Sequence, residues 1–272
     1  MLVKNPSHRK ALQNNQITTL KIICKFQFIT VPLLSQYLAK DRSTCYEQLL
    51  TLVSQEYVHK RYYQSYRIRR LPARYYLADR GLACLKNQTE LSDRLLAVQR
   101  RNQMARPQLV EDYLARFALC NQLRRRYPAV FEIFTKTELV VAEDFIRPRP
   151  DLYVRPSPAQ AQSSVEYFVE QLPVGVPSWR LRKRLRTHDD LAAEADYQYP
   201  QLLLVCANES TVTRLQKIVA TEQFDLVILT TTLDQFYSDE LVIWRQLRWD
   251  YDEEAEPQLT ALSTGRQASG AQ

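Results

Sequence analysis

Apolar residues recur at helical spacing in the first part of the chain. Residues 17–24 carry apolar side chains three and four positions apart, which predicts a first helix capped by Asn14 or Asn15. Residues 30–32 supply a cap and a proline for a second helix, and Ser43 can cap a third. The third helix should bury one stripe of residues and expose another. The expected buried stripe is Tyr46, Leu49, Leu50 and Val53, and the expected exposed set is Thr44, Glu47, Gln48 and Thr51.

After the third helix the pattern changes to alternation. Residues 57–64 and 73–77 alternate between apolar and polar side chains and flank a short basic connection, so they predict a β-hairpin with a cationic tip. Three short helices followed by such a hairpin is the order of a winged helix-turn-helix domain. Residues 77–85 predict a further short helix, and the polar residues 87–106 predict a linker or a connecting helix.

The second half of the chain alternates between strand and helix patterns. A helix is expected from Pro107, because proline suits a first helical turn. The nearly continuous apolar run at 201–207 is typical of a strand with both faces covered. The order of elements predicts an α/β sandwich with a mixed sheet. Strands are expected at 130–135, 138–145, 149–154, 165–172, 201–207 and 225–231, further helices at 179–195 and 211–221, and a last strand or helix at 241–249.

These patterns together predict an α+β chain with two domains. A winged-helix domain at 14–86 and an α/β domain at 107–249 are joined by residues 87–106. A basic, flexible arm (1–13) precedes them. An acidic and polar tail (250–272) follows, and its composition predicts disorder.

Charge is divided unequally between the two predicted domains. Residues 1–106 contain 19 Lys and Arg against 6 Asp and Glu, a net charge of +13. The remaining residues contain 18 basic and 24 acidic side chains, a net charge of −6. A basic domain joined to an acidic one predicts that polyanions bind to the N-terminal part.

Composition argues against several kinds of site. The five cysteines are scattered without a CxxC pair, which argues against a zinc site or a disulfide framework and favours free buried thiols. Only four glycines are present, and none forms a Gly-rich phosphate loop. His8, His59 and His188 are isolated from cysteine and acid clusters in the sequence, so no ligand role is assigned to them. The N-terminus lacks an apolar signal core, and no apolar run approaches the roughly 20 residues that span a bilayer, so a cytoplasmic protein without a membrane partner is expected.

The N-terminal part resembles the winged helix of the replication-relaxation family, whose members are encoded on plasmids and conjugative elements. The matching segments are FQFITVPLLSQYLAKDRSTCYEQLLTLVSQEYV (26–58) and ARYYLADRGLACL (73–85). The resemblance covers most of residues 14–232. It implies a DNA-binding accessory protein of a mobile element, with a role in replication, mobilisation or the relaxosome. Double-stranded DNA is the partner it implies, and a relaxase, a replication protein or a second copy of the chain are the protein partners it suggests.

The C-terminal part is similar to that family's second domain, in which a Pro-Asp strand precedes a strand that ends in glutamate. The corresponding segments are RPDL (149–152) and EYFVEQ (166–171). Their arrangement resembles the PD-(D/E)xK core of restriction endonucleases. The resemblance therefore implies a C-terminal α/β domain with a mixed sheet of the restriction-endonuclease-like type.

The stretch Tyr57–Tyr76 contains six basic side chains, six tyrosines and no acidic residue. Cations at a hairpin tip suit backbone phosphates or the minor groove, and such binding weakens steeply with salt. Polar side chains of the preceding helix can pair with base edges. The alternatives are an ordinary solvated helix face and a solubilising basic surface. The candidate DNA-binding residues are Arg42, Ser43, Thr44, Glu47, Gln48, Thr51, Lys60, Arg61, Arg67, Arg69, Arg70 and Arg74.

Asp151 and Glu170 are candidate metal ligands and catalytic acids. Paired carboxylates on neighbouring strands can hold Mg²⁺, which activates water for attack on a phosphate. That chemistry usually also uses a lysine two residues after the glutamate, where this chain has Leu172. Lys183 or Arg182 is a candidate replacement. We therefore expect a degenerate nuclease fold that needs no cofactor, with an active Mg²⁺-dependent nuclease as the alternative and a structural, backbone-bonded Asp151 as the plainest interpretation.

Residues 180–186 (RLRKRLR) form a second cationic cluster. It can contact DNA, or it can pair with the acids at 189–196 of the same helix, and the sequence favours neither.

Three functions remain open. The first is the DNA-binding accessory protein, the second is a metal-dependent DNA nuclease targeted by the winged helix, and the third is a transcriptional regulator whose second domain senses a small molecule.

Overall fold

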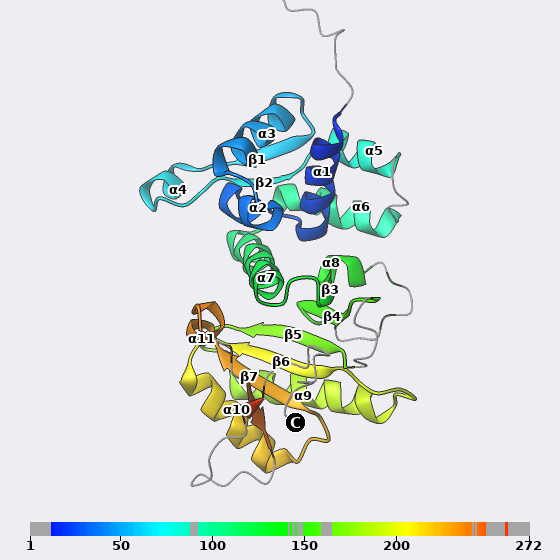
Figure 1. Cartoon of the computed structure of the whole chain (residues 1–272), viewed down its shortest axis with the longest axis vertical. Coiled ribbons are helices and arrows are strands. Elements are labelled where there is room, and N and C mark those ends of the chain that lie inside the picture. Colours follow the sequence, from blue (N-terminus) through cyan, green and yellow to red (C-terminus); the bar gives the residue numbers. More distant parts are fainter. Residues whose placement is uncertain are drawn as a thin grey trace, which may run out of the picture. The chain divides into compact units, whose positions relative to one another are not determined.

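The structure of the chain is a computed structural model that describes residues 12–87, 92–140, 142, 145, 149–158, 165–240, 242, 244–248 and 259–260. It is a mixed α+β structure with two compact units (Figure 1). Unit 1 is Met1–Phe117 and unit 2 is Ala118–Gln272. The boundary falls inside helix α7 (Pro107–Arg126), and not at Pro107 as the sequence predicted.

Some expectations concern residues outside the described ranges. Most of the basic arm (1–13) and most of the tail (250–272) belong to this group. Within the tail, Leu259–Thr260 forms strand β9 and pairs with Trp244 and Arg245, so the predicted disorder is wrong for those two residues.

Unit 1 consists of short helices around a two-stranded antiparallel ribbon. The helices start close to the predicted positions because the apolar spacing is regular and Thr30 caps α2, its side chain accepting from the amide of Leu33. The elements are α1 (Asn14–Phe26), α2 (Val31–Leu38), α3 (Arg42–Ser54), β1 (Val58–Arg61), α4 (Gln64–Ile68), β2 (Arg74–Leu77), α5 (Asp79–Lys86), α6 (Asp93–Arg100), the 3₁₀ helix η1 (Arg101–Met104) and the first part of α7.

The predicted hairpin is present, but its tip differs from the expectation. β1 and β2 pair in register from Val58↔Leu77 to Arg61↔Arg74, and Ile29 adds a bridge to Tyr75. The connection between the strands is not a simple turn, because it contains the short helix α4. α5 then packs closely on the chain before β1. A Cβ at Gly81 would lie 2.2 Å from the carbonyl oxygen of Tyr57, so only glycine fits there.

The buried stripe of α3 is rotated from the predicted one. Cys45, Leu49 and Leu52 are buried, whereas Tyr46 is 43% exposed and Leu50 is 37% exposed. The prediction is confirmed for Leu49 but wrong for Tyr46 and Leu50, because Leu52 and Cys45 face the core beside Leu49. Cys45 fills the buried position instead, next to the helix start. Two apolar side chains therefore face outward from α3.

The polar stretch after α5 is a packed part of unit 1, and not a linker. α6 buries Leu95, Leu96 and Gln99. The Gln99 side chain donates to the carbonyl of Cys24 at 2.6 Å and accepts from Asn102 at 3.1 Å. Buried amides that satisfy main-chain groups make a segment look polar in sequence although it belongs to the core.

The first part of α7 completes the core of unit 1. Phe117 stacks on Phe26 with ring centroids 4.0 Å apart. Val110 and Leu114 pack with Phe28 in a second buried cluster. These contacts explain why the boundary of unit 1 lies beyond Pro107.

Unit 2 is built on a seven-stranded sheet in the order β3-β4-β5-β6-β7-β8-β9. The central pairs β5–β6 and β6–β7 are parallel and all the other pairs are antiparallel, which confirms the predicted mixed sheet. The strands are β3 (Phe131–Thr135), β4 (Leu152–Pro156), β5 (Tyr167–Leu172), β6 (Gln201–Cys206), β7 (Ile228–Thr232), β8 (Trp244–Leu247) and β9, and the helices are α8 (Lys136–Leu139), α9 (Ser178–Ala193), α10 (Glu209–Glu222) and α11 (Leu233–Tyr237).

The strand predicted at 138–145 is wrong where the structure describes it. Residues Lys136–Leu139 form helix α8. The side chains of Thr135 and Glu138 make a reciprocal capping box, in which each accepts from the other's backbone amide. Two hydrogen bonds at the helix start favour the helix over a strand with the same apolar residues.

Helices α9 and α10 cover one face of the sheet (Figure 1). Leu181 and Leu185 of α9 and Leu215 of α10 pack on strand residues such as Leu202 and Leu204 in one buried cluster. The buried strands β6 and β7 explain the long apolar runs in the sequence.

All five cysteines are free, and four of them are buried while Cys84 is half-buried. Within the described part of the chain, no helix is both long enough and apolar enough to cross a membrane.

Candidate nucleic-acid interface

A groove of about 560 Å³ lies in unit 1 between the start of α3 and the β1–β2 ribbon. Arg42, Ser43 and Tyr46 line it from α3, and Lys60 and Tyr62 line it from the ribbon. The α3 residues and the ribbon residues are separated in the sequence by the rest of α3, yet they line the same groove. The predicted helix and the predicted ribbon therefore share one surface feature.

The exposed face of α3 combines polar and apolar side chains. Ser43, Tyr46, Glu47 and Leu50 are three or four positions apart, so they lie on one face, and all four are exposed. The sequence predicted Ser43 and Glu47 as DNA-binding residues but placed Tyr46 and Leu50 in the core. An exposed tyrosine and leucine on such a face supply apolar contacts that a purely polar face lacks.

Gln48 points toward α1, and not away from the protein. Its side-chain amide donates to the carbonyl of Asn15 at 2.8 Å and to the hydroxyl of Thr19 at 2.7 Å. The predicted base contact is therefore replaced by a link between α1 and α3. Thr44 is exposed, and the Thr51 hydroxyl donates to the carbonyl of Glu47 in its own helix at 3.0 Å.

Arg61 is buried, although the sequence placed it among the cations that contact DNA. Its guanidinium donates to the carbonyls of Asn102, Gln103 and Ala105 at 3.1, 2.8 and 3.0 Å. These carbonyls lie at the end of η1 or just after it, and that of Asn102 also accepts from the backbone amide of Ala105 at 3.2 Å. Arg61 thus anchors β1 to the end of η1, and this role corrects its assignment to the interface.

Arg74 is also held inside unit 1 and is 2% exposed. It donates to Glu111 at 2.7 Å and to the carbonyl of Pro72. Its guanidinium also lies 4.2 Å from the centre of the Tyr66 ring. The assignment of Arg74 to the interface is corrected in the same way, because its donors are directed into the protein.

The remaining basic side chains of the ribbon are exposed. Lys60 borders the groove, with its ammonium 5.8 Å from the centre of the Tyr62 ring. Arg67, Arg69 and Arg70 are exposed at the α4 tip. Among the residues that the structure describes, these three side chains have no hydrogen-bond or ion-pair partner. Their charges are therefore available to an external polyanion.

In unit 2, Asp151 and Glu170 are both buried but have different partners. The carboxylate of Asp151 accepts from the backbone amide of Gln171 at 3.1 Å. Glu170 is 1% exposed and forms an ion pair with Arg184. The structure thus provides the backbone hydrogen bond that the plainest interpretation of Asp151 expected.

A chain of polar side chains continues from Glu170 through buried His188 to half-buried Tyr199. Its Oε1 lies 3.6 Å from His188 Nε2, and His188 Nδ1 lies 2.8 Å from the hydroxyl of Tyr199. Burial raises the pKa of the Tyr199 hydroxyl, and the charges of Tyr197 and Glu170 raise it further, so the hydroxyl keeps its proton. The sequence indicated that His188 is isolated from acids. The structure corrects this, because His188 lies beside Glu170.

The position of the expected catalytic lysine is filled by a core residue. Leu172 is 1% exposed and packs in the cluster beneath α9 and α10. Lys183 is exposed on α9, in a groove that Arg182 also lines. Arg184 is the cation that reaches Glu170. In the described residues no three His, Cys, Asp or Glu side chains are grouped so as to hold a metal ion.

The cationic cluster at 180–186 pairs with α10 and, through Arg184, with Glu170 of β5, and not with the acids later in its own helix. Arg182 and Arg186 both contact Glu222, at 3.0 and 2.7 Å. Asp189 accepts from the backbone amide of Asp225 at 3.0 Å. The cluster thus joins α9 to its neighbours, which leaves fewer of its charges for an external ligand.

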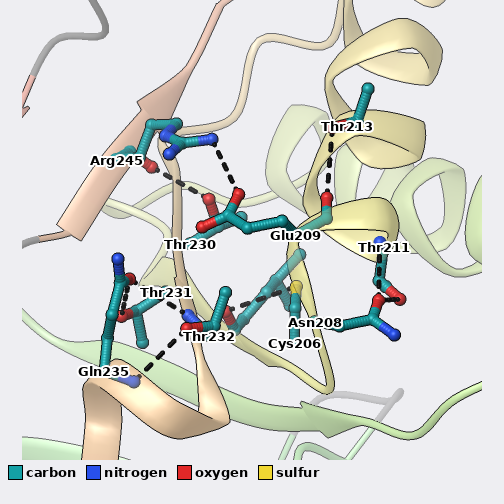
Figure 2. A network of polar contacts seen from close by, with 11 residues as sticks. Cys206, Asn208, Glu209, Thr211, Thr213, Thr230, Thr231, Thr232, Gln235 and Arg245 are labelled. Carbon is teal, nitrogen blue, oxygen red and sulfur yellow. Dashed lines mark hydrogen bonds and ion pairs between the residues drawn. The ribbon is translucent and has the colours of Figure 1, made fainter.

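A polar network occupies the carboxyl ends of β6 and β7, where α/β folds often bind ligands (Figure 2). Asn208 caps α10 and Thr232 caps α11. The Thr230 hydroxyl donates to the carbonyl of Arg245, whose guanidinium lies 3.3 Å from Glu209. These groups bond to each other, which indicates that the network caps helices and joins β7 to β8.

Comparison of the chain with protein-family models, with curated proteins and with solved structures finds no match.

Proposed function

We propose that unit 1 is a winged helix-turn-helix domain that binds double-stranded DNA, and that the chain is a DNA-binding accessory protein of a plasmid or another mobile element. The order of α1, α2, α3 and the β1–β2 ribbon supports this domain type. The mobile-element context rests on the resemblance to the replication-relaxation family. On the mobile element, the protein takes part in replication, in mobilisation or in the relaxosome.

One observation carries the proposal. The start of α3 and the part of the ribbon around Lys60 and Tyr62 line the same groove, and Arg42 and Lys60 are exposed there. In this arrangement α3 enters the major groove with Ser43, Tyr46, Glu47 and Leu50 toward the bases. Arg42 and Lys60 then lie beside the phosphates, and the tip arginines extend along the backbone.

Unit 2 supplies dimerisation or partner recruitment in this proposal. A mixed sheet in which α9 connects the parallel strands β5 and β6 supports a restriction-endonuclease-like core. Leu172 at the lysine position and the Arg184 ion pair on Glu170 both favour a domain without nuclease activity. A relaxase, a replication protein or a second copy of the chain is the partner class that this role requires.

Fluorescence anisotropy with labelled duplex DNA tests the proposal. The logarithm of the affinity should fall linearly with the logarithm of salt concentration. Replacing Arg67, Arg69 and Arg70 together by alanine should reduce the magnitude of the salt slope by roughly 2 to 3.

A matched control removes the same charge elsewhere in unit 1. Arg94, Arg101 and Arg106 are exposed and lie outside the ribbon, so their triple alanine variant should retain most of the affinity. Binding that does not change between low and moderate salt would contradict the proposal. Equal losses in the two triple variants would contradict the assignment to the ribbon.

A further inference from the structure

The tip of the ribbon carries an apolar side chain among cations. Ile68 is 75% exposed, and Arg67, Arg69 and Arg70 surround it in the sequence and are exposed as well. Exposure of an apolar isoleucine side chain to water at such a position is unfavourable in free energy. Its combination with three cations without partners in the described residues suits a ligand that is both anionic and apolar.

The tip is held in a defined conformation. α4 ends in a Schellman motif, in which Arg70 has φ = 52°, its amide donates to Arg67 and the amide of Leu71 donates to Tyr66 at 2.8 Å. Tyr66 is buried beneath the guanidinium of Arg74. A tip that is fixed before binding loses little conformational entropy when it is inserted into a ligand.

Duplex DNA offers both properties at one place. Phosphates border the minor groove on each side, and the faces of stacked bases between them are apolar. Proteins that bend DNA from the minor groove insert an apolar side chain between two base pairs and bind the phosphates with flanking cations. Figure 1 shows α4 at the far end of the ribbon, away from α1 and α5, where such an insertion meets no obstacle from unit 1.

We propose that α4 is a wedge, in which Ile68 inserts between two base pairs from the minor groove and bends the duplex while Arg67, Arg69 and Arg70 bind the adjacent phosphates. This inference rests on the proposed function, because it requires that unit 1 binds duplex DNA. An anionic membrane surface is the competing ligand. A membrane-binding helix needs a broad apolar face, whereas α4 has five residues and Ile68 is its one strongly exposed apolar side chain.

The test uses the full chain and two duplexes of 30 base pairs that carry a donor and an acceptor fluorophore at their ends. One duplex has TA steps at its centre, which are easily unstacked, and the other has a stiff A-tract of the same composition. Energy transfer reports the bend, and anisotropy of the same samples reports binding. The variants are Ile68→Ala and, as a control, Met104→Ala, which removes an apolar side chain of 87% exposure outside the ribbon.

We expect the wild type and the Met104→Ala variant to increase energy transfer on the TA duplex more than on the A-tract duplex. Ile68→Ala should lose that increase and bind the TA duplex about tenfold more weakly, because the burial of one isoleucine is lost. Its salt slope should be unchanged, because every arginine remains. Thermal unfolding of each variant verifies that the fold is intact.

The outcomes separate the two proposals. Salt-dependent binding without any bend, or a bend that Ile68→Ala retains, overturns the wedge and leaves the DNA-binding function standing. Failure of the wild type to bind either duplex overturns both. A third outcome favours a membrane-binding tip. The wedge is overturned if the wild type does not bend DNA but sediments with anionic phosphatidylserine vesicles, and Ile68→Ala abolishes that sedimentation.

Discussion

Arg74 Nη2 lies 2.7 Å from Glu111 Oε1, and this ion pair joins strand β2 to the first part of α7 within unit 1. Arg74 is almost fully buried, whereas the side chain of Glu111 is half exposed. A buried arginine with a half-exposed partner stabilises the fold chiefly because its removal leaves several acceptors unpaired. Because Arg74 begins β2 directly after the tip and packs on Tyr66 of α4, it also supports the tip.

Replacement of Arg74 by alanine should lower the free energy of unfolding by about 2–3 kcal/mol, because hydrogen bonds, an ion pair and packing on Tyr66 are lost together. The matched control is Arg67→Ala, which removes an exposed arginine of α4 and should change stability by less than about 0.5 kcal/mol. Urea unfolding measures both. If the two variants were equally stable, Arg74 would have no structural role.

Gln48 should behave as a structural residue, and not as a base-reading one. Gln48→Ala removes two hydrogen bonds to α1 and should cost about 1–2 kcal/mol of stability. The preferred DNA sequence, selected from a random duplex pool, should not change. Glu47→Ala, at the neighbouring exposed position, should do the opposite and alter the selected sequence with little effect on stability. A changed sequence preference for Gln48→Ala at full stability would contradict this assignment.

The sequence predicted the fold best where the apolar residues follow one regular spacing over a long segment. Strands β6 and β7 and helices α9 and α10 lie within three residues of the predicted bounds, because their apolar patterns are long and regular. A strand was predicted from residue 138, but residues 136–139 form α8, because Thr135 and Glu138 cap each other at the helix start. The cap residues were visible in the sequence as a T-x-x-E pattern, which was the available signal.

The predicted helix and ribbon line one groove, but three of the side chains predicted to bind DNA form hydrogen bonds inside unit 1. Arg61 and Arg74 look like their exposed neighbours in sequence, and their partners are about 40 residues away at 102–105 and 111. Gln48 was likewise assigned outward because its acceptors lie in α1. Sequence shows which side chains can bond, but the partner of a polar side chain is set by tertiary packing.

Alkaline pH should destabilise the fold in part through Cys206. Burial raises the pKa of its thiol from 9.0 to about 12, and the charge of Glu209 adds to the effect. The thiol therefore keeps its proton in the folded state at pH values where it loses it on unfolding. Its contribution to stability is complete below pH 9 and is lost progressively as the pH rises toward 12.

Guanidinium unfolding at pH 8 and pH 10.5 measures this contribution. The wild type should lose more stability between the two values than Cys206→Ala, although the variant is less stable at both because of the cavity it creates. Cys84→Ala is the control, since Cys84 is half-buried and its pKa is raised by less. Identical pH dependence in all three proteins would contradict the role of Cys206. Tyrosines with raised pKa values, including Tyr75, contribute equally to all of them.

Glu170 should contribute to stability, and not to cleavage of DNA. Glu170→Gln removes the charge that faces Arg184 and His188, and should cost about 2 kcal/mol in urea unfolding, since Arg184 is partly exposed and keeps some hydration. Asp151→Asn is the matched control, because its amide oxygen can still accept from Gln171. Its stability should stay close to that of the wild type.

The same proteins decide whether unit 2 cleaves DNA. Supercoiled plasmid incubated with the wild type and Mg²⁺ or Mn²⁺ should remain supercoiled, because Leu172 stands where the chemistry needs a lysine and Arg184 neutralises Glu170. Agarose gels report nicked and linear products. The opposite result is metal-dependent cleavage by the wild type and no cleavage by Glu170→Gln or Asp151→Asn. It would establish the nuclease and refute a purely structural role for the Glu170–Arg184 ion pair. Stability lost in Glu170→Gln alone, with intact plasmid throughout, is the result that the buried Glu170–Arg184 pair predicts.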